Sequence, residues 1–174
     1  KKYSFIRAIG ILPQQGVFKF VEEEFTVKED IERVSKMINL IVVIPEEKYK
    51  KVKEIKEGLV KIAESLKQKV WVHVMSHVDV FNYGLDSKYD YMADIGMSYP
   101  LYDKDFLASL RVAEYHKHLV LRKFEKYIVS YVVGGSYIRG DTVKGSDVDT
   151  YVIIDDTDVK RMSRLELKEK LRGW

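Results

Sequence analysis

Two aspartates near the end of the chain are spaced so that they could hold a metal ion. Asp147 and Asp149 alternate at the start of the predicted strand 147–154, so their carboxylates are expected on one face while Val148 points into the core. Two carboxylates so close repel each other, and a divalent cation between them removes that cost. Mg²⁺ takes one or two protein carboxylates and completes its shell with water and substrate phosphates. The pair therefore predicts a site for Mg²⁺ or Mn²⁺.

A glycine-serine turn precedes the aspartates and is suited to phosphate. Gly134, Gly135 and Ser136 follow the predicted strand 127–133. Glycines have no Cβ, so backbone N–H groups can approach a triphosphate closely. Ser136 can add a hydroxyl hydrogen bond, and the segment SYIRG is expected to begin a short helix. The turn and the aspartate pair would then face one another across adjacent strands.

Two other phosphate-binding motifs do not fit these residues. The G-x-x-x-x-G-K-[S/T] spacing of a P-loop is absent, and residues 144–146 precede a strand instead of a helix. The glycines do not match G-x-G-x-x-G either. The remaining alternative is a tight turn with aspartates that face solvent. Arg139 and Lys144 are candidates for extra positive charge, and a solvated surface position is the alternative for both.

Composition limits the class of protein. The chain has 174 residues, 46% of them hydrophobic, which is enough for one core or two small ones. The absence of cysteine excludes disulfides and thiolate metal sites. A net charge of +3 is too small to indicate nucleic acid binding by itself. The high charged fraction (33%) with few Asn and Gln resembles a thermophile's composition. No apolar run or signal-peptide pattern points to a membrane, so a cytoplasmic protein is expected.

The elements that would position these residues alternate between strands and helices. We predict strands at 3–12 and 16–25 around a turn, a buried strand at 39–44, a helix from Pro45 to about 68, and a period-two strand at 69–81. Asp103 is expected to cap a second long helix, and a last helix is expected from Val159. The predicted class is α/β or α+β, with a mixed sheet flanked by helices.

The first half of the chain repeats the pattern of the second half at an offset of 110 residues. Residues 17–21 align with 127–131, and 41–44 align with 151–154. The individual identities are weak, and a chance match of two α/β units is the alternative. The alignment predicts two related units, 1–103 and 104–174.

The differences between the two halves predict that only the second is equipped for chemistry. Residues 24–26, Glu-Phe-Thr, stand where the second half has its glycine-serine turn. Met37 and Asn39 stand where it has the aspartates. A glutamate repels phosphate, and a methionine cannot hold Mg²⁺, which demands hard oxygen ligands. The first unit is therefore expected to be degenerate.

The spaced combination GGS…SDVD resembles the DNA polymerase β-like nucleotidyltransferase superfamily, and most of all its small and archaeal-type members. The segment IGMSYPLYDKDF is similar to the one that closes such domains, which supports 39–106 as the tail of a degenerate first copy. The resemblance implies that Asp147 and Asp149 are catalytic and bind the metal ions. It also implies nucleotide binding by Gly134, Gly135, Ser136 and Ser146. The residues that match the pattern are Gly135, Ser136, Gly140, Ser146, Asp147 and Asp149.

The family pattern also contains a third carboxylate, on a third core strand. In the first unit that strand is predicted at 69–81, and the offset places its partner beyond residue 174. The expectation is that the piece ends inside its active-like domain and is incomplete for catalysis. A borrowed carboxylate from Asp79 is the alternative. His73 and His77 are interpreted as core or surface histidines, since a strand gives them no helical metal geometry.

The resemblance implies transfer of a nucleoside monophosphate from an NTP, with ATP expected, to an acceptor hydroxyl. RNA, protein and small molecules are all open as acceptors, and a homo-oligomer is compatible with the sequence. Two alternatives from other classes remain. One is a non-catalytic module that binds a nucleotide or a partner, and the other is an antitoxin-like protein that modifies or masks a partner.

Overall fold

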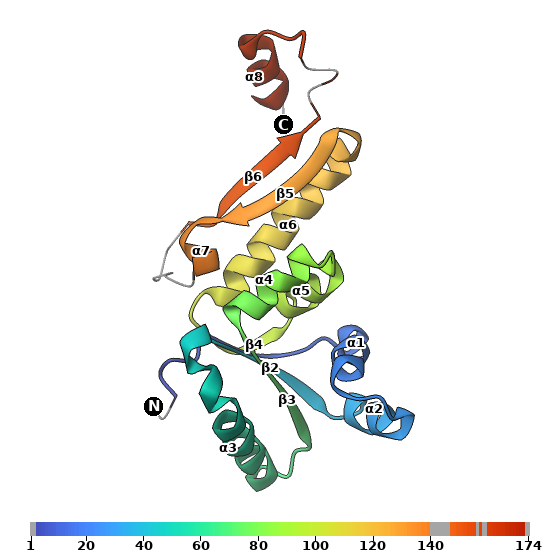
Figure 1. Ribbon diagram of the computed structural model, residues 1–174, viewed down its shortest axis with the longest axis vertical. Coiled ribbons are helices and arrows are strands. Elements are labelled where there is room, and N and C mark those ends of the chain that lie inside the picture. Colours follow the sequence, from blue (N-terminus) through green and yellow to red (C-terminus); the bar gives the residue numbers. More distant parts are fainter. Residues whose placement is uncertain (1–2, 140–146, 156, 158–159, 173–174) are drawn as a thin grey trace.

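A computed structural model of the chain contains two β-sheets joined by a long helix (Figure 1). It describes residues 3–139, 147–155, 157 and 160–172. A four-stranded sheet with its helices forms one end of the molecule, and a two-stranded sheet forms the other. This mixed α+β architecture confirms the predicted fold class.

The four-stranded sheet is mixed, with the order β3-β2-β1-β4. β1 pairs antiparallel with both β2 and β4, and β2 pairs parallel with β3. The central strand β2 is buried along almost its whole length, which explains the continuous apolar run that predicted it. The strands are β1 (Ala8–Ile11), β2 (Ile38–Ile44), β3 (Val70–Ser76) and β4 (Tyr99–Asp103).

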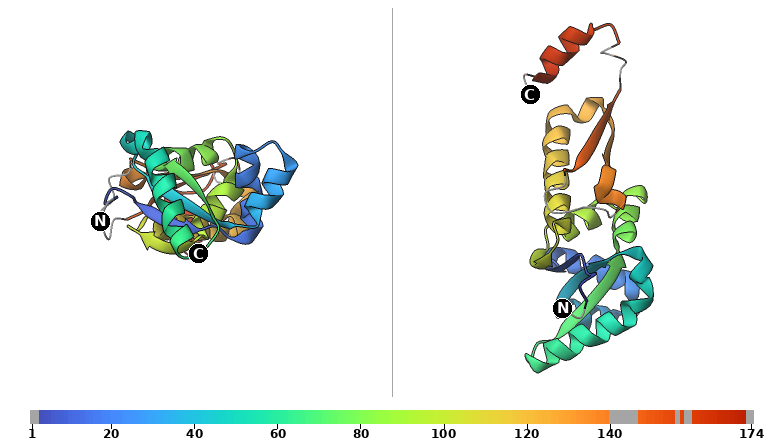
Figure 2. Two further views of the ribbon diagram at one scale, coloured as in Figure 1. Left: turned by 90° about the horizontal axis from the view of Figure 1, so that it is seen from below. Right: turned by 90° about the vertical axis from the view of Figure 1, so that its left-hand side faces the viewer.

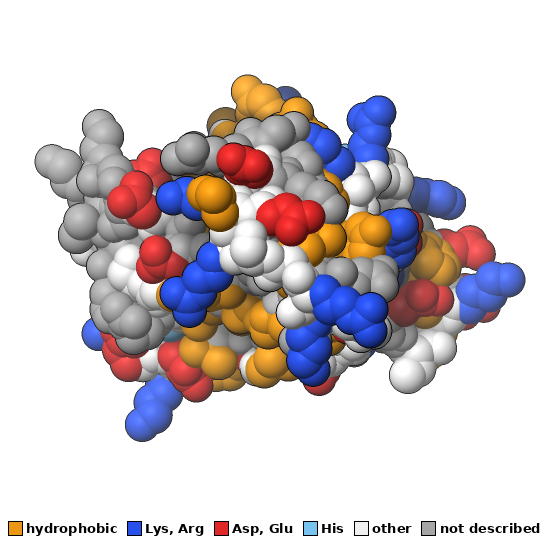
Figure 3. Space-filling model, turned by 90° about the horizontal axis from the view of Figure 1, so that it is seen from above, with side chains coloured by type: hydrophobic (Ala, Val, Ile, Leu, Met, Phe, Trp, Pro, Cys, Tyr) orange, Lys and Arg blue, Asp and Glu red, His pale blue; other side chains and the backbone are white. Residues whose placement is uncertain are grey.

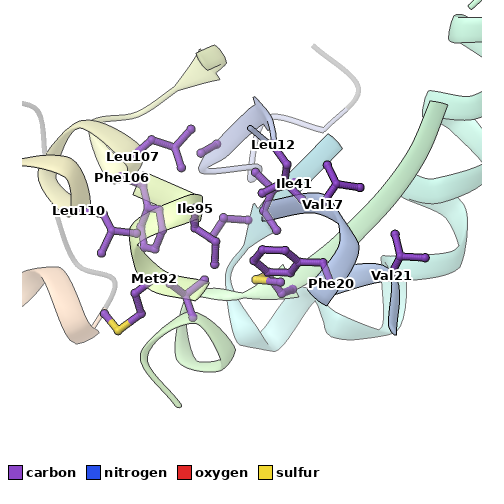
Figure 4. Packing of buried hydrophobic residues seen from close by; sticks show 14 of the residues in the cluster. Leu12, Val17, Phe20, Val21, Ile41, Met92, Ile95, Phe106, Leu107 and Leu110 are labelled. Atoms are coloured by element: carbon purple, nitrogen blue, oxygen red, sulfur yellow. The ribbon is translucent and has the colours of Figure 1, made fainter. Parts of the chain in front are cut away.

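Helices cover both faces of this sheet. Ile41 and Val43 of β2 belong to a core with helices α1, α2, α4, α5 and α6 (Figure 4), whereas Val42 and Ile44 pack with helix α3. The bounds are α1 (Gln14–Glu24), α2 (Lys28–Ser35), the 3₁₀ helix η1 (Glu46–Lys51), α3 (Val52–Ser65), α4 (His77–Leu85), α5 (Tyr89–Gly96) and α6 (Phe106–Phe124). We refer to the larger cluster, which contains Ile41, Phe106 and Tyr137, as the main core.

The prediction of a strand at 16–25 is wrong, because α1 occupies this segment. The buried residues Val17, Phe20 and Val21 have the three- and four-residue spacing of a helix, whereas Phe18 is half exposed. Pro13 stands at the N-cap in place of the predicted hairpin turn. Burial of one helical face against the main core therefore overrides the β propensity of these side chains.

The predicted strand 69–81 divides into a strand and a helix at Ser76. The Ser76 hydroxyl accepts a hydrogen bond from the Asp79 amide at 3.1 Å, and the Asp79 carboxylate accepts one from the Ser76 amide at 2.7 Å. This capping box starts α4. His77 therefore begins a helix instead of sharing a strand face with His73.

The long helix α6 connects the two sheets. Its first turns bury Phe106, Leu107 and Leu110 in the main core. Both carboxylate oxygens of Asp103 accept hydrogen bonds from backbone amides of this first turn, at 3.0 Å, which agrees with the predicted capping role. The last turns lie beside the two-stranded sheet (Figure 2).

The two-stranded sheet is an antiparallel pair supported mainly on one face. It consists of β5 (Ile128–Gly134) and β6 (Asp149–Ile154), and it is joined by the short 3₁₀ helix η2 (Glu125–Tyr127) to α6. The short helix α7 (Gly135–Arg139) follows β5, and α8 (Arg164–Arg172) lies beyond β6. The last helix thus begins later than the predicted start at Val159, which lies outside the described residues.

Several apolar side chains of this sheet are exposed. Val129, Tyr151 and Ile153 have 68%, 60% and 50% of their surface accessible. Figure 3, seen from the end that carries α8, shows hydrophobic side chains at the surface between charged ones. Among the described residues, no helix is long and apolar enough to cross a membrane.

Candidate functional site

The glycine turn and one aspartate of the motif meet at one end of the two-stranded sheet. Gly134 pairs with Asp149 in the antiparallel register, and Gly135 has a positive φ of 76°. The Asp149 carboxylate lies directly against Gly135, so that a Cβ at this position would collide with its Oδ2 atom. Glycine is therefore required at 135 both by its backbone conformation and by the neighbouring carboxylate.

The two aspartates lie on either side of an anchored valine. Asp149 is the first residue of β6, and Asp147 lies two residues before the strand, so the predicted strand start at 147 is two residues early. Both aspartates are exposed, whereas Val148 packs against the main core as predicted. Both carboxylates are thus accessible from solvent.

The other predicted site residues are divided between α7 and the segment that follows it. Ser136 is the second residue of α7 and is half buried. Ser146, Gly140 and Lys144 lie outside the described residues, and so does the side chain of Arg139. The structure therefore brings together Gly134, Gly135 and Asp149 with Ser136 adjacent to them.

Tyr137 is a residue of this site that the sequence reasoning missed. It is 1% exposed, belongs to the main core and donates a hydrogen bond from its hydroxyl to the Phe106 carbonyl at 2.6 Å. Its ring lies 5.3 Å from that of Phe81 and 5.2 Å from that of Phe106. The sequence signal that could have predicted its burial was the position of an aromatic residue immediately after the small residues of the turn.

The antiparallel pairs β1–β2 and β5–β6 can be compared at the end of the pair where β6 carries Asp149. The Leu12 amide donates to the Asn39 carbonyl at 2.9 Å, which extends the antiparallel β1–β2 pairing by one residue pair. Leu12 and Asn39 therefore correspond to Gly134 and Asp149 at the ends of the two sheets. The alignment of 17–21 with 127–131 is wrong, because the first segment is helical and the second lies mainly in β5. The sequence offset of 110 residues also aligns Asn39 with Asp149, and this alignment agrees with the strand pairing in the two sheets.

Asn39 takes part in a buried hydrogen-bond network instead of facing a free site. Its Nδ2 atom donates to the carbonyls of Val34 and Met37, both at 3.0 Å. Its Oδ1 atom therefore faces the Nε2 atom of His73 at 2.8 Å. The other ring nitrogen of His73 lies 2.8 Å from the Glu24 carboxylate. Both ring nitrogens of His73 thus lie within hydrogen-bond distance of a side-chain oxygen.

Glu24 is the negative partner in this network. Burial alone would raise the pKa of Glu24, but the hydrogen bond and the charge of His73 act in the opposite direction. Lys56 and the indole N–H of Trp71 add to the second effect, so the pKa of Glu24 lies below its ordinary value. In the four-stranded sheet, Asn39 and the pair formed by Glu24 and His73 thus occupy the position that Asp149 has in the two-stranded sheet.

The other histidines and tyrosines have structural contacts. His73 and His77 are both buried, as the core interpretation predicts. Tyr83 and Tyr91 stack with ring centroids 4.6 Å apart, next to Phe20, while Tyr99 and Tyr102 are exposed on β4. The cluster in α4 and α5 therefore packs these helices onto α1.

Asp147 and Asp149 are the candidate carboxylates for a metal ion. In the part of the chain that the structure describes, no group of three or more His, Asp or Glu side chains is placed to hold a metal. Asp79, the candidate for a borrowed carboxylate, is engaged in the capping box of α4. Exposed carboxylate oxygens are groups that suit Mg²⁺, which keeps waters and phosphates in its shell.

A comparison with protein-family models gave one finding for this region. Residues 115–174 match the model described as a nucleotidyltransferase domain. The matched segment covers about a third of the chain and includes the GGS…SDVD motif. The match begins in the second half of α6 and contains β5, α7, β6 and α8, so the family resemblance predicted from the sequence is confirmed there. A search of curated proteins and a search of solved structures gave no match.

Proposed function

We propose that the chain binds a nucleoside triphosphate at the glycine turn and transfers its nucleoside monophosphate to an acceptor hydroxyl. The contact between the Asp149 carboxylate and the Gly135 backbone carries this proposal, together with the nucleotidyltransferase segment 115–174. A carboxylate beside backbone amides that can bind phosphate is the arrangement that a metal-bound triphosphate needs.

The reaction replaces a phosphoanhydride bond with a phosphate ester bond. The acceptor oxygen forms a bond to the α-phosphorus, the bond to pyrophosphate breaks, and the hydroxyl proton is released. Asp147 and Asp149 would hold Mg²⁺ or Mn²⁺, which stabilises phosphate charge and acidifies a hydroxyl when bound. Gly135 and Ser136 would bind the β- and γ-phosphates, so donors are in place before charge develops.

The four-stranded sheet has a non-catalytic role in this proposal. At the position of Asp149 it carries Asn39, whose amide is fully engaged with His73 and two backbone carbonyls. At the position of the glycine turn it carries Leu12 and Pro13, and proline has no amide hydrogen to offer a phosphate. The four-stranded sheet therefore has neither a carboxylate at the position of Asp149 nor a glycine turn at the position of Gly134 and Gly135.

Nucleotide binding in the presence of a divalent cation tests this function. Calorimetric titration of the chain with ATP, in Mg²⁺ and in EDTA, should show binding that depends on the metal. Asp149→Asn should weaken that binding at least about tenfold, because the metal loses a charged ligand. Asp155→Asn is the matched control, since Asp155 is exposed just after β6 and its carboxylate bonds to Thr157, two residues further along the chain.

The two functional classes give different results in the same experiment. A non-catalytic nucleotide-binding module would bind ATP with Mg²⁺ but release no pyrophosphate with any acceptor. This second candidate is favoured by one observation: among the described residues, no third carboxylate joins Asp147 and Asp149. Equal affinities for the wild type, Asp149→Asn and Asp155→Asn would contradict metal binding at Asp149 in both cases.

A further inference from the structure

The glycine turn is attached to the main core of the four-stranded sheet through Tyr137. This side chain inserts between Phe81 of α4 and Phe106 of α6, with the ring of Phe81 nearly perpendicular at 84° and that of Phe106 at 37°. The hydroxyl donates to the Phe106 carbonyl at 2.6 Å. Burial raises the pKa of Tyr137 well above its ordinary value, so the hydroxyl stays protonated and remains a donor.

Two further side chains attach the same region to the main core. Val133 immediately precedes Gly134, and Val148 lies between the two aspartates of the motif; both pack against this cluster. The turn is thus held on both sides, by Val133 before it and Tyr137 after it, and the aspartate segment is held by Val148. All three contacts lead to the same cluster of buried side chains.

This support is needed because the two-stranded sheet is small. An isolated pair of strands is marginally stable in water. Its outward face is exposed at Tyr151 and Ile153, so this face contributes little burial. The rigid elements nearest the turn are α4 and α6, and α7 lies against α4. A site needs support from packed elements to hold its groups in a productive geometry.

We propose that Tyr137 is a positioning residue, which holds the glycine turn against Asp149 by joining it to the core of the four-stranded sheet. The degenerate sheet then serves the second site as its rigid foundation. The part of this inference that concerns nucleotide affinity rests on the function proposed above. The part that concerns the order of the glycine turn is independent of that function.

Tyr137→Phe is the sharpest variant, because it keeps the ring in the core and removes only the hydroxyl that bonds to Phe106. Tyr131→Phe is the matched control. The Tyr131 hydroxyl also donates to a carbonyl of α6, that of Ala113 at 3.2 Å, but it lies in the middle of β5. The Tyr131 hydroxyl also lies 2.8 Å from His116 Nδ1 on α6. Both variants therefore lose a hydroxyl that contacts the same helix, and they differ in their distance along the chain from the turn.

Hydrogen–deuterium exchange of residues 134–138 and ATP titration with Mg²⁺ are measured on the full chain. Tyr137→Phe should speed exchange in this segment about fivefold and weaken ATP binding by a similar factor, as expected for one lost buried hydrogen bond. Tyr131→Phe should leave both quantities at the wild-type values. Unchanged exchange in Tyr137→Phe, or equal changes in both variants, would overturn the inference.

The failure of the proposed function gives a separate result. If the wild type binds no ATP, that function is wrong, while the exchange measurement still decides the role of Tyr137. Faster exchange confined to Tyr137→Phe then supports a positioning role, and equal exchange in the wild type and both variants rejects it.

Discussion

The Asp149 carboxylate lies directly against the backbone of Gly135, so the residues proposed to hold the metal ion and the phosphates share one contact. The contact explains why the turn carries glycine at this position. It also means that a change at either residue alters the surroundings of the other. Substitutions at the turn should therefore affect metal-dependent binding as well as phosphate contacts.

Gly135→Ala should damage both folding and binding. The left-handed backbone costs a non-glycine residue about 1–2 kcal/mol, and the new methyl group would displace the carboxylate. We expect a lower free energy of unfolding in urea by about this amount and at least about tenfold weaker ATP binding with Mg²⁺.

The same substitution elsewhere provides the control. Gly58 lies within α3, where alanine is the better helix former by about 1 kcal/mol. The nearest atom to an added Cβ is the hydroxyl at the far end of the half-buried Tyr3 side chain, at 3.0 Å. Gly58→Ala should leave the ATP affinity unchanged. Wild-type stability and wild-type affinity in Gly135→Ala would show that the turn adopts another conformation.

Asn39→Asp should destabilise the first sheet without creating a metal site. The amide group of Asn39 donates to two carbonyls, and a carboxylate would turn both bonds into contacts between oxygens. A cost of about 2–4 kcal/mol is expected in urea unfolding, because buried acceptors lose their donors. Asn82→Asp is the control, since Asn82 is exposed on α4, and it should change stability by less than about 0.5 kcal/mol. Equal effects would argue against the network.

The pair formed by Glu24 and His73 predicts loss of stability in acid. The pKa of Glu24 is lower in the folded chain than its ordinary value of 4.5, so its contribution is present above that value and is lost as the pH falls through the folded pKa. Glu24→Gln should therefore lower the free energy of unfolding at pH 7 by no more than about 1 kcal/mol, because the carboxylate is partly exposed. The difference from the wild type should shrink as the pH falls from 4.5 and disappear below the folded pKa.

Glu22→Gln tests whether this effect is specific to the pair. Glu22 lies on the same helix and is exposed. It should have the same unfolding free energy as the wild type between pH 3 and pH 7. A Glu24→Gln variant whose deficit is constant over this range would indicate a packing effect instead of an ionic one.

Isoleucine-to-alanine substitutions at two positions should separate the buried sheet from the exposed one. Ile41 is fully buried in β2, whereas Ile153 in β6 is 50% exposed. Ile41→Ala should cost about 2–5 kcal/mol, and Ile153→Ala less than about 1 kcal/mol, in urea unfolding. A cost above about 2 kcal/mol at Ile153 would mean that its face of the sheet is covered in solution.

Regular patterns in the sequence predicted the elements whose packing is local. The run from Asn39 to Ile44 predicted β2 because a strand buried on both faces is continuously apolar. The motif strands were placed to within two residues, and the glycine turn lies where its residue types indicated. The proximity of Gly135 and Asp149 followed from their places at the ends of paired strands.

Errors arose where side-chain types and tertiary packing favour different structures. The segment of α1 alternates aromatic and β-branched residues, yet the spacing of Val17, Phe20 and Val21 places them on one helical face. At the end of β3, the S-x-x-D pattern of Ser76 and Asp79 was a sequence signal for a helix start that the period-two pattern obscured.

Contacts between distant segments could not be predicted at all. Tyr137 is joined to Phe106 and Phe81 across 31 residues or more of sequence, and no local periodicity encodes such a pairing. The network of Asn39, His73 and Glu24 likewise depends on how α1 packs on the sheet.

The continuity of α6 limits where the chain can be recombined. A chimaera with its crossover at Asp103 would separate β4 from the helix whose Phe106, Leu107 and Leu110 fill the core beside it. In such a chimaera, α6 of one parent protein would have to pack against the four-stranded sheet of the other. Exchange of the nucleotidyltransferase segment between homologues therefore requires either co-inheritance of this helix or compensating changes in the residues around it.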